Sequence, residues 1–105
     1  MRFIETPIFT RKVVELLDDE EYRSMQLALL LRPELGKVIR KSAGLRKARW
    51  PLPDQGKRGG RRVIYYWDEA SETFYMLHAY PKNEQEDLTP QQLRVLNRLV
   101  HEEFT

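Results

Sequence analysis

Hydrophobic and polar positions follow two periods along the chain, helical towards both ends and strand-like between them. In the first third, apolar positions recur at the spacing of a helix that Asp18 caps and that ends near Arg32, because Pro33 disfavours helix before it. Another helix is expected over residues 7–17, after a short strand over residues 2–6. This region therefore predicts a strand followed by two helices.

Strand-like patterns begin after the small residues around position 44. Residues 45–50 have apolar ends with cations between them, and residues 61–67 are dense in β-branched and aromatic side chains. A short polar connection leads to another strand over residues 73–80, which implies an antiparallel hairpin. The intervening residues 51–60, rich in Pro and Gly, are expected to form a loop.

The last element has a clear start signal, with Thr89 as the cap, Pro90 at the first helical position and Gln92 three residues after the cap. A C-terminal helix should follow, with an apolar side formed by Leu93, Leu96, Val100 and Phe104. This order of elements predicts an α+β fold, a single domain over residues 1–105 with an antiparallel meander sheet. We expect the helices to cover one face of that sheet and leave the other face to the cations.

Composition narrows the possible chemistry. The 105 residues include no cysteine, which excludes disulfides, thiolate catalysis and cysteine-based zinc sites, and the two histidines are too few and too far apart for an all-histidine metal site. We therefore expect neither a metal nor a cofactor. No stretch approaches the roughly 18 apolar residues of a membrane helix, and no leader pattern is visible, so a cytoplasmic location is expected.

Charge is divided unevenly along the sequence. The net charge of +2 conceals a basic segment over residues 40–62, which has nine Lys and Arg against one acid, and a remainder with a net charge of −6. The basic segment contains Arg40, Lys41, Arg46, Lys47, Arg49, Lys57, Arg58, Arg61 and Arg62, with Asp54 as its acid. Arginine forks suit phosphate oxygens, so this segment predicts a surface that grips nucleic-acid phosphates.

Alternation along a strand places Lys47 and Arg49 on one face, and pairing with the strand that starts at Arg61 should bring Arg62 close to them. Such cations would repel one another unless an anion settled among them. The glycine-rich run around Lys57 and Arg58 lacks the spacing of a nucleotide-binding loop and precedes a strand, so we interpret it as a flexible grip on an RNA backbone. Aromatic side chains nearby are candidates to stack on bases, although at least half should be buried: Trp50, Tyr65, Tyr66, Trp67 and Tyr80.

Three stretches resemble the RelE/ParE superfamily of bacterial type II toxins, closest to its HigB-like branch. They are Gly44-Leu45-Arg46-Lys47-Ala48-Arg49, then Gly56-Lys57-Arg58-Gly59-Gly60-Arg61-Arg62-Val63-Ile64-Tyr65-Tyr66, then Lys82-Asn83-Glu84 with Asp87-Leu88-Thr89. The resemblance implies a RelE-like fold and a ribosome-dependent endoribonuclease that cuts mRNA in the A site, against 16S rRNA, without a metal. It also implies an antitoxin encoded beside the toxin, expected to be a small helix-turn-helix protein.

The resemblance also implies the site residues. The catalytic positions match Lys47, Arg49, Arg62, Tyr80 and Lys82. Among these, Arg62 matches the holder of the scissile phosphate, and Tyr80 stands in for a tyrosine that relatives carry nearer the C-terminus. The RNA-binding positions are Arg46, Lys57, Arg58 and Arg61. The chain departs from better-studied relatives at Asn83, where they have an arginine. Glu84, Glu86, His78 and Asp87 stay open as proton-transfer groups.

Two other functions fit parts of this pattern. A ParE-like inhibitor of DNA gyrase would bind protein and would not need Lys47, Arg49 and Arg62 together. A noncatalytic module that binds RNA or the ribosome would need the basic segment but no proton-transfer group.

Arg62 is expected to be exposed, so its replacement should cost little stability.

Overall fold

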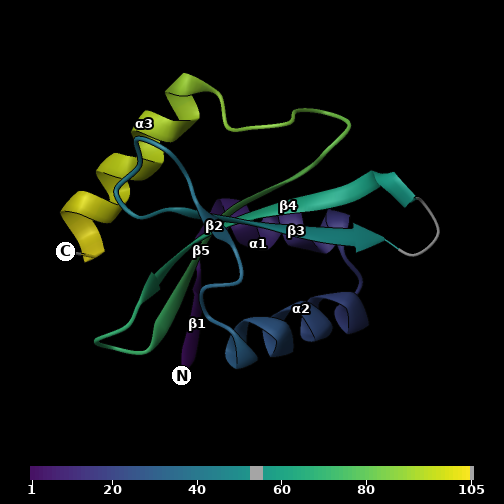
Figure 1. Ribbon diagram of the computed structural model, residues 1–105, viewed down its shortest axis with the longest axis horizontal. Helices are drawn as coiled ribbons and strands as arrows, with labels where there is room; N and C mark the ends of the chain where they lie inside the picture. Colours follow the sequence, from purple (N-terminus) through teal and green to yellow (C-terminus); the bar gives the residue numbers. More distant parts are fainter. Residues whose placement is uncertain (53–55, 105) are drawn as a thin grey trace.

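The computed structural model describes residues 1–52 and 56–104, with the side chains of residues 52–59 and 104 outside the described part. Figure 1 shows a sheet with helices on both of its sides. The elements are β1 (Arg2–Glu5), α1 (Pro7–Leu16), α2 (Asp19–Leu31), β2 (Lys37–Val38), β3 (Arg46–Leu52), β4 (Gly56–Asp68), β5 (Thr73–Pro81), α3 (Pro90–Leu99) and a π-helical turn (Val100–Phe104).

The sheet has five strands in the order β1-β5-β4-β3-β2. The last four strands in the sequence form the antiparallel meander that we expected, while β1 pairs in parallel with β5, its Arg2 opposite Thr73. The α+β class is therefore confirmed. β2 was not predicted from the sequence, because two residues are too few to show a period.

Capping side chains begin each helix. Asp18 accepts a hydrogen bond from the backbone of Glu21 and Thr89 from that of Gln92, and both complete a capping box, as the sequence indicated. Thr6, which we had not singled out, caps α1 by accepting from the amide of Phe9.

Within the described ranges, none of the helices has both the length and the apolar surface that a membrane crossing requires.

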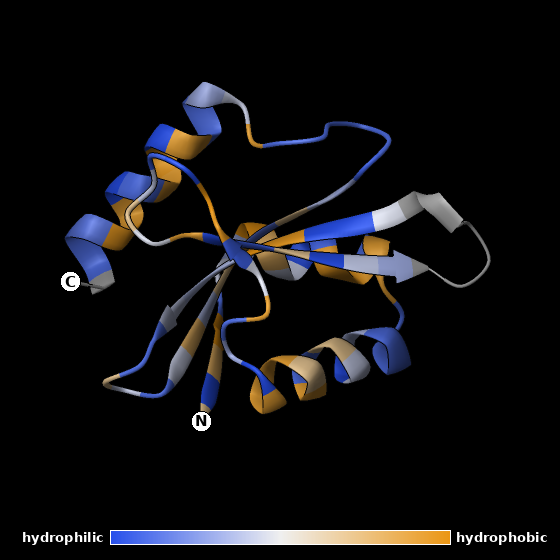
Figure 2. Cartoon of the chain, in the orientation of Figure 1, coloured by the Kyte–Doolittle hydropathy of each residue, from blue (hydrophilic) through white to orange (hydrophobic). Residues whose placement is uncertain are grey.

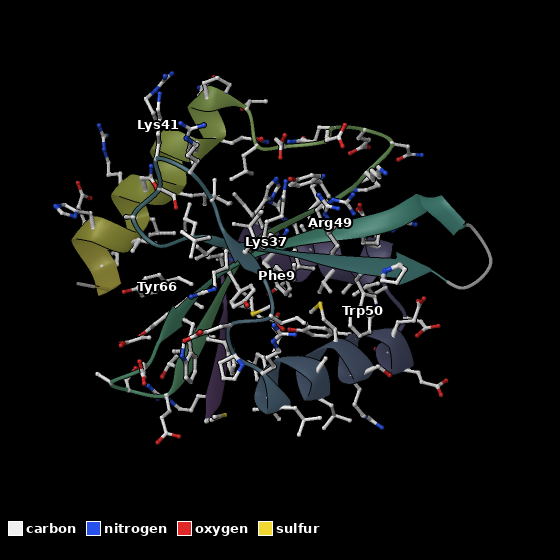
Figure 3. The ribbon with its side chains drawn as sticks, in the orientation of Figure 1. Phe9, Lys37, Lys41, Arg49, Trp50 and Tyr66 are labelled. Carbon is white, nitrogen blue, oxygen red and sulfur yellow. The ribbon has the colours of Figure 1, made fainter. Side chains whose placement is uncertain are left out.

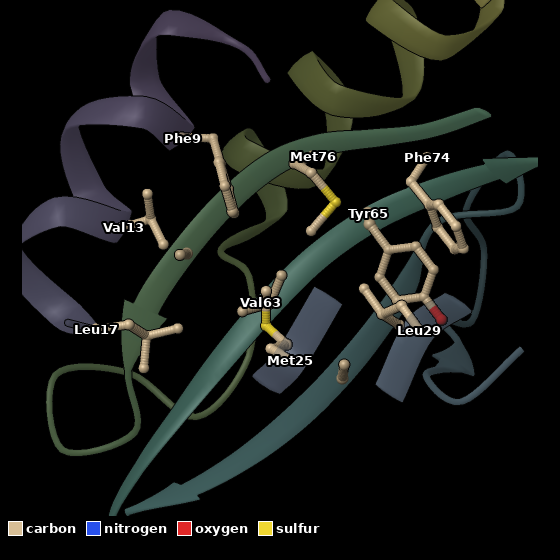
Figure 4. Close-up of a cluster of buried hydrophobic side chains, with 11 residues drawn as sticks. Phe9, Val13, Leu17, Met25, Leu29, Val63, Tyr65, Phe74 and Met76 are labelled. Atoms are coloured by element: carbon tan, nitrogen blue, oxygen red, sulfur yellow. The ribbon is translucent and has the colours of Figure 1, made fainter. Parts of the chain in front are cut away.

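The larger core lies between one face of the sheet and the helices α1 and α2 (Figure 4). Its buried side chains come from α1 and from the short segment after it, from α2, and from the central strands. They are Phe9, Val13, Leu17, Met25, Leu29, Ala48, Val63, Tyr65, Phe74, Met76 and Ala79. This face of the sheet is therefore closed.

The C-terminal helix covers the opposite face, so the expectation that all helices would cover one face was wrong. Leu45, Ile64 and Leu77 project from that face and form a smaller core with Val100. Figure 2 shows apolar positions interleaved with polar ones along α3, and the apolar side of this helix needs a sheet surface to bury it. α3 therefore shares this face with the side chains of Lys47, Arg49 and Arg62.

The strands β3 and β4 extend into the segment that we expected to be a loop. β3 continues through Pro51 to Leu52, and β4 begins at Gly56, so only residues 53–55 of that segment lie outside the described backbone. A register shift between Trp50 and Leu52 accommodates Pro51, which has no amide hydrogen for the ladder. The loop prediction was wrong for most of its length, because the long hairpin overrides the propensity of Pro and Gly.

Candidate functional site

Strand register brings the predicted cations together. Arg49 on β3 lies opposite Arg62 on β4, and Arg62 lies opposite Tyr80 on β5, so the three side chains form a row across the sheet. Lys47 precedes Arg49 by two residues and therefore shares its face. We call Lys47, Arg49 and Arg62 the cationic site.

Arg62 is buried, with 5% of its surface exposed, so the expectation of an exposed arginine was wrong. Its Nη1 donates to the backbone carbonyl of Arg61 at 3.4 Å, while its Nε has no hydrogen-bond partner among the described residues. A buried donor without a partner is costly, and it is expected mainly where a ligand completes the site. The alternation pattern gave the face of this side chain but not its burial, which depends on what packs over it in the fold.

An acidic side chain from the same chain reaches the cationic site. Lys47 forms an ion pair with Asp87, which lies in the connecting segment, residues 82–89, between β5 and α3. The hydrogen bond from Lys47 lowers the pKa of the Asp87 carboxyl, and the charges of Arg49 and Arg62 add to this effect. Asp87 is therefore ionised at neutral pH.

Two residues of the cationic site, Lys47 and Arg49, line a hollow of about 430 Å³ beside the connecting segment. Its lining residues are Lys37, Val38, Ile39, Arg40, Lys47, Arg49, Asp87, Leu88 and Leu93. In Figure 3 Arg49 lies towards this segment, whereas Trp50 lies towards α2. Lys37, which β2 places opposite Lys47, was not predicted from the sequence as part of the site. The signal that could have indicated it is that no acid occurs between Lys37 and Arg49.

Tyr80 lies beneath the connecting segment, with 2% of its surface exposed. Its hydroxyl donates to the backbone carbonyl of Glu86 at 3.4 Å. Burial raises the pKa of Tyr80 to about 12, and the nearby Asp87 adds to the rise. The phenol is therefore protonated at neutral pH. Lys82 follows β5 and its backbone amide donates to the carbonyl of Gly60 at 3.0 Å, which places it at the same end of the sheet as Arg62.

Two predicted RNA-binding arginines contact the opposite side of the sheet. Arg46 donates from Nη1 to the carbonyl of Gly36 at 2.8 Å, and Arg61 donates from Nε to the carbonyl of Leu16 at 3.3 Å. Both bonds hold backbone of neighbouring segments in place, which separates these arginines from the cationic site. The predicted grip by Lys57 and Arg58 lies outside the described side chains.

His78 lines a separate hollow of about 380 Å³ between α1 and α3, with Ile8, Gln92 and Leu96 among its neighbours. Burial lowers the pKa of His78, and the nearby Lys12 lowers it further. This histidine is therefore mainly neutral at pH 7. It lies beside Tyr80, with ring centroids 5.8 Å apart, but it does not line the hollow of the cationic site.

The candidate stacking aromatics all pack against one of the two cores. Tyr65 and Tyr80 are buried, and Trp50, Tyr66 and Trp67 are half-buried. Two of the five are thus fully buried, slightly fewer than we expected. Since each contributes to a core, a base would have to approach through the remaining exposed edges.

The family whose model matches this chain is described as the RelE toxin of the RelE / RelB toxin-antitoxin system, and the match covers residues 34–104. This range runs from β2 through α3 and includes the cationic site and Asp87. It leaves out the strand β1, which pairs with β5, and the helices α1 and α2, which close the opposite face of the sheet.

Proposed function

We propose that this protein is an endoribonuclease that cuts mRNA on the ribosome. The proposal follows from its family, because this chain belongs to the RelE toxin family and is therefore the toxin of a type II toxin–antitoxin system. The observation that carries the proposal is Arg62, a buried guanidinium whose Nε lacks a partner among the described residues. A phosphodiester of RNA in the A site would supply the missing acceptor.

The proposed reaction uses the nucleophile that RNA carries itself. The 2′-oxygen attacks the adjacent phosphorus, and the bond between that phosphorus and the 5′-oxygen of the next nucleotide breaks. The products end in a 2′,3′-cyclic phosphate and a 5′-hydroxyl. Negative charge accumulates on the phosphate oxygens in the transition state. Arg49 and Arg62 lie opposite each other on adjacent strands and are suited to stabilise that charge.

The proton transfers need one base and one acid. A neutral amine would accept the proton of the 2′-hydroxyl, and an ammonium group would give a proton to the leaving 5′-oxygen. Asp87 has a lowered pKa and Tyr80 a pKa of about 12, so at neutral pH the first is a weak base and the second a weak acid. We assign the two transfers to Lys47 and Lys82. Tyr80 would then act by hydrogen bonding, with its phenol protonated.

An antitoxin is the expected partner for regulation. The basic segment over residues 40–62 has a net charge of +8, so we expect the antitoxin to present a complementary acidic or helical segment. A small helix-turn-helix protein encoded next to this toxin would fit that role.

A cell-free translation reaction tests the proposal. Addition of the purified toxin should produce new mRNA ends within the coding region, detected by primer extension, while the same RNA without ribosomes stays largely intact. Intact mRNA in a reaction whose protein synthesis has stopped would instead support a noncatalytic ribosome binder. Loss of DNA supercoiling activity by gyrase, with intact mRNA, would support the gyrase inhibitor.

A further inference from the structure

Asp87 occupies the place where the proposed function requires a phosphate. It is the one acidic side chain among the described residues that line the hollow, and it pairs with Lys47 and interacts electrostatically with Arg49 and Arg62. A carboxylate and a phosphodiester both present anionic oxygens to such cations. The same three residues therefore attract either anion.

The backbone of the connecting segment, residues 82–89, is tied at several points. At its start the amides of Glu84 and Gln85 donate to the carbonyl of Pro81, and at its end Thr89 caps α3. Between them Gln85 donates from Nε2 to the Asp87 carbonyl at 2.9 Å.

Two further contacts join the segment to α3 and to the smaller core. Gln85 Nε2 also donates to Gln92 Oε1 at 2.9 Å, and Leu88 packs against the smaller core. The Asp87 carboxylate contacts Lys47 on β3 and can rotate out of the hollow without breaking these backbone ties.

The ion pair is suited to exchange. Asp87 has 70% of its side-chain surface exposed and Lys47 has 19%, so the carboxylate is already largely hydrated and its release to water costs little. The phosphodiester gains more, because it meets the buried Arg62, whose Nε still lacks an acceptor among the described residues. The exchange therefore favours the RNA once it is bound in the site.

We propose that the Asp87 carboxylate is an internal substitute for the substrate phosphate, which pairs with Lys47 when RNA is absent and rotates out of the hollow when a phosphodiester enters. This inference rests on the proposed function, since it assigns the same site to RNA. It makes the Asp87 side chain a gate that favours polyanions, which can reach several of these cations at once, over small anions. The lowered pKa of Asp87 agrees with it, because the carboxylate stays ionised at neutral pH.

The test measures the affinity of an RNA oligonucleotide whose 2′-hydroxyls are all methylated, so that it cannot be cut. Fluorescence anisotropy at low salt compares the wild type with Asp87→Asn and with Glu86→Gln. The control removes the same charge from the adjacent residue, whose side chain makes no ion pair in the described structure. Asp87→Asn should tighten binding about two- to fivefold, and more than Glu86→Gln does.

A second measurement follows the gate itself. In two-dimensional NMR spectra, the amide signals of Asp87 and Leu88 should move on addition of the oligonucleotide to the wild type. In the spectrum of Asp87→Asn without RNA, these signals should lie closer to the positions that they take in the RNA-bound wild type. This readout depends on displacement of the Asp87 side chain and not on cleavage.

The outcomes separate the gate from the proposed function. Equal or weaker binding by Asp87→Asn, with normal binding by the wild type, overturns the gate and leaves the RNA site in place. Unchanged affinity with cleavage on the ribosome reduced a hundredfold or more overturns it too, because Asp87 would then be a proton-transfer group. Absence of binding by every protein at low salt overturns the gate, and the proposed function is then decided by mRNA cleavage on the ribosome.

Discussion

At the scale of the residue, Arg62 shows how a functional group is retained against stability. A guanidinium with 5% exposure and an unsatisfied Nε would not be selected for folding, since an apolar side chain of similar length would bury the same surface without that cost. The cost is explained if the side chain is held ready for a phosphate. Stability and activity should therefore change in opposite directions at this position.

Arg62→Met should raise the free energy of unfolding by about 1–3 kcal/mol, because it removes the buried unsatisfied donor and keeps the chain length. Urea denaturation followed by circular dichroism measures this change. The matched variant Arg49→Met, at an exposed position in the same row, should stay within about 0.5 kcal/mol of the wild type. A clear loss of stability in Arg62→Met would contradict our interpretation of its burial.

His78 gives a prediction for the pH dependence of stability. Its pKa in the folded protein lies below the ordinary value of 6.5, so the unfolded chain binds the extra proton more readily. The contribution of His78 is therefore fully present above pH 6.5 and decreases as the pH falls below it. His78→Gln should show a smaller drop in urea midpoint between pH 7.5 and pH 5.5 than the wild type, and an equal drop in both proteins would refute this assignment.

At the scale of the element, local signals in the sequence were enough to predict most helices and strands. The capping boxes at Asp18 and Thr89 and the dense strand before Asp68 depend on neighbouring residues, and the structure confirms them. The parallel pairing of β1 with β5 joins residues about seventy positions apart, which no local pattern encodes. The side on which α3 packs is likewise decided by tertiary contacts.

The packing of α3 can be tested with two identical substitutions, one in its middle and one in the π-helical turn that follows it. Val100 is fully buried in the smaller core, whereas Val95 is 60% exposed. Val100→Ala should lower the free energy of unfolding by about 1–3 kcal/mol, and Val95→Ala by less than about 0.5 kcal/mol. Equal effects in thermal and urea denaturation would mean that α3 does not cover this face of the sheet in solution.

At the scale of the whole molecule, the sequence revealed the charge asymmetry but not how the fold sorts the charges. Alternation and pairing were sufficient to bring Lys47, Arg49 and Arg62 together. They could not show that Asp87, about forty residues away from Lys47 in sequence, would return to the same site. They also could not show that Arg46 and Arg61 would bind backbone carbonyls on the opposite side.

This sorting of charges predicts different salt dependences for two arginines. Phosphate contacts release counterions, so the affinity for the methylated RNA oligonucleotide should fall as salt rises. Arg49→Met should reduce the slope of log affinity against log salt concentration by about one, the value for one phosphate contact, because Arg49 lies in the hollow. Arg61→Met should leave the slope nearly unchanged, and a reduction equal to that of Arg49→Met would place Arg61 on the RNA.

The measurement that tests the central claim most directly compares the wild type with Arg62→Met in one translation reaction. Primer extension should reveal new mRNA ends within the coding region for the wild type and none above background for Arg62→Met, although the variant is folded and no less stable. Equal cleavage by the two proteins would contradict the account, because the phosphate would then not be held by Arg62.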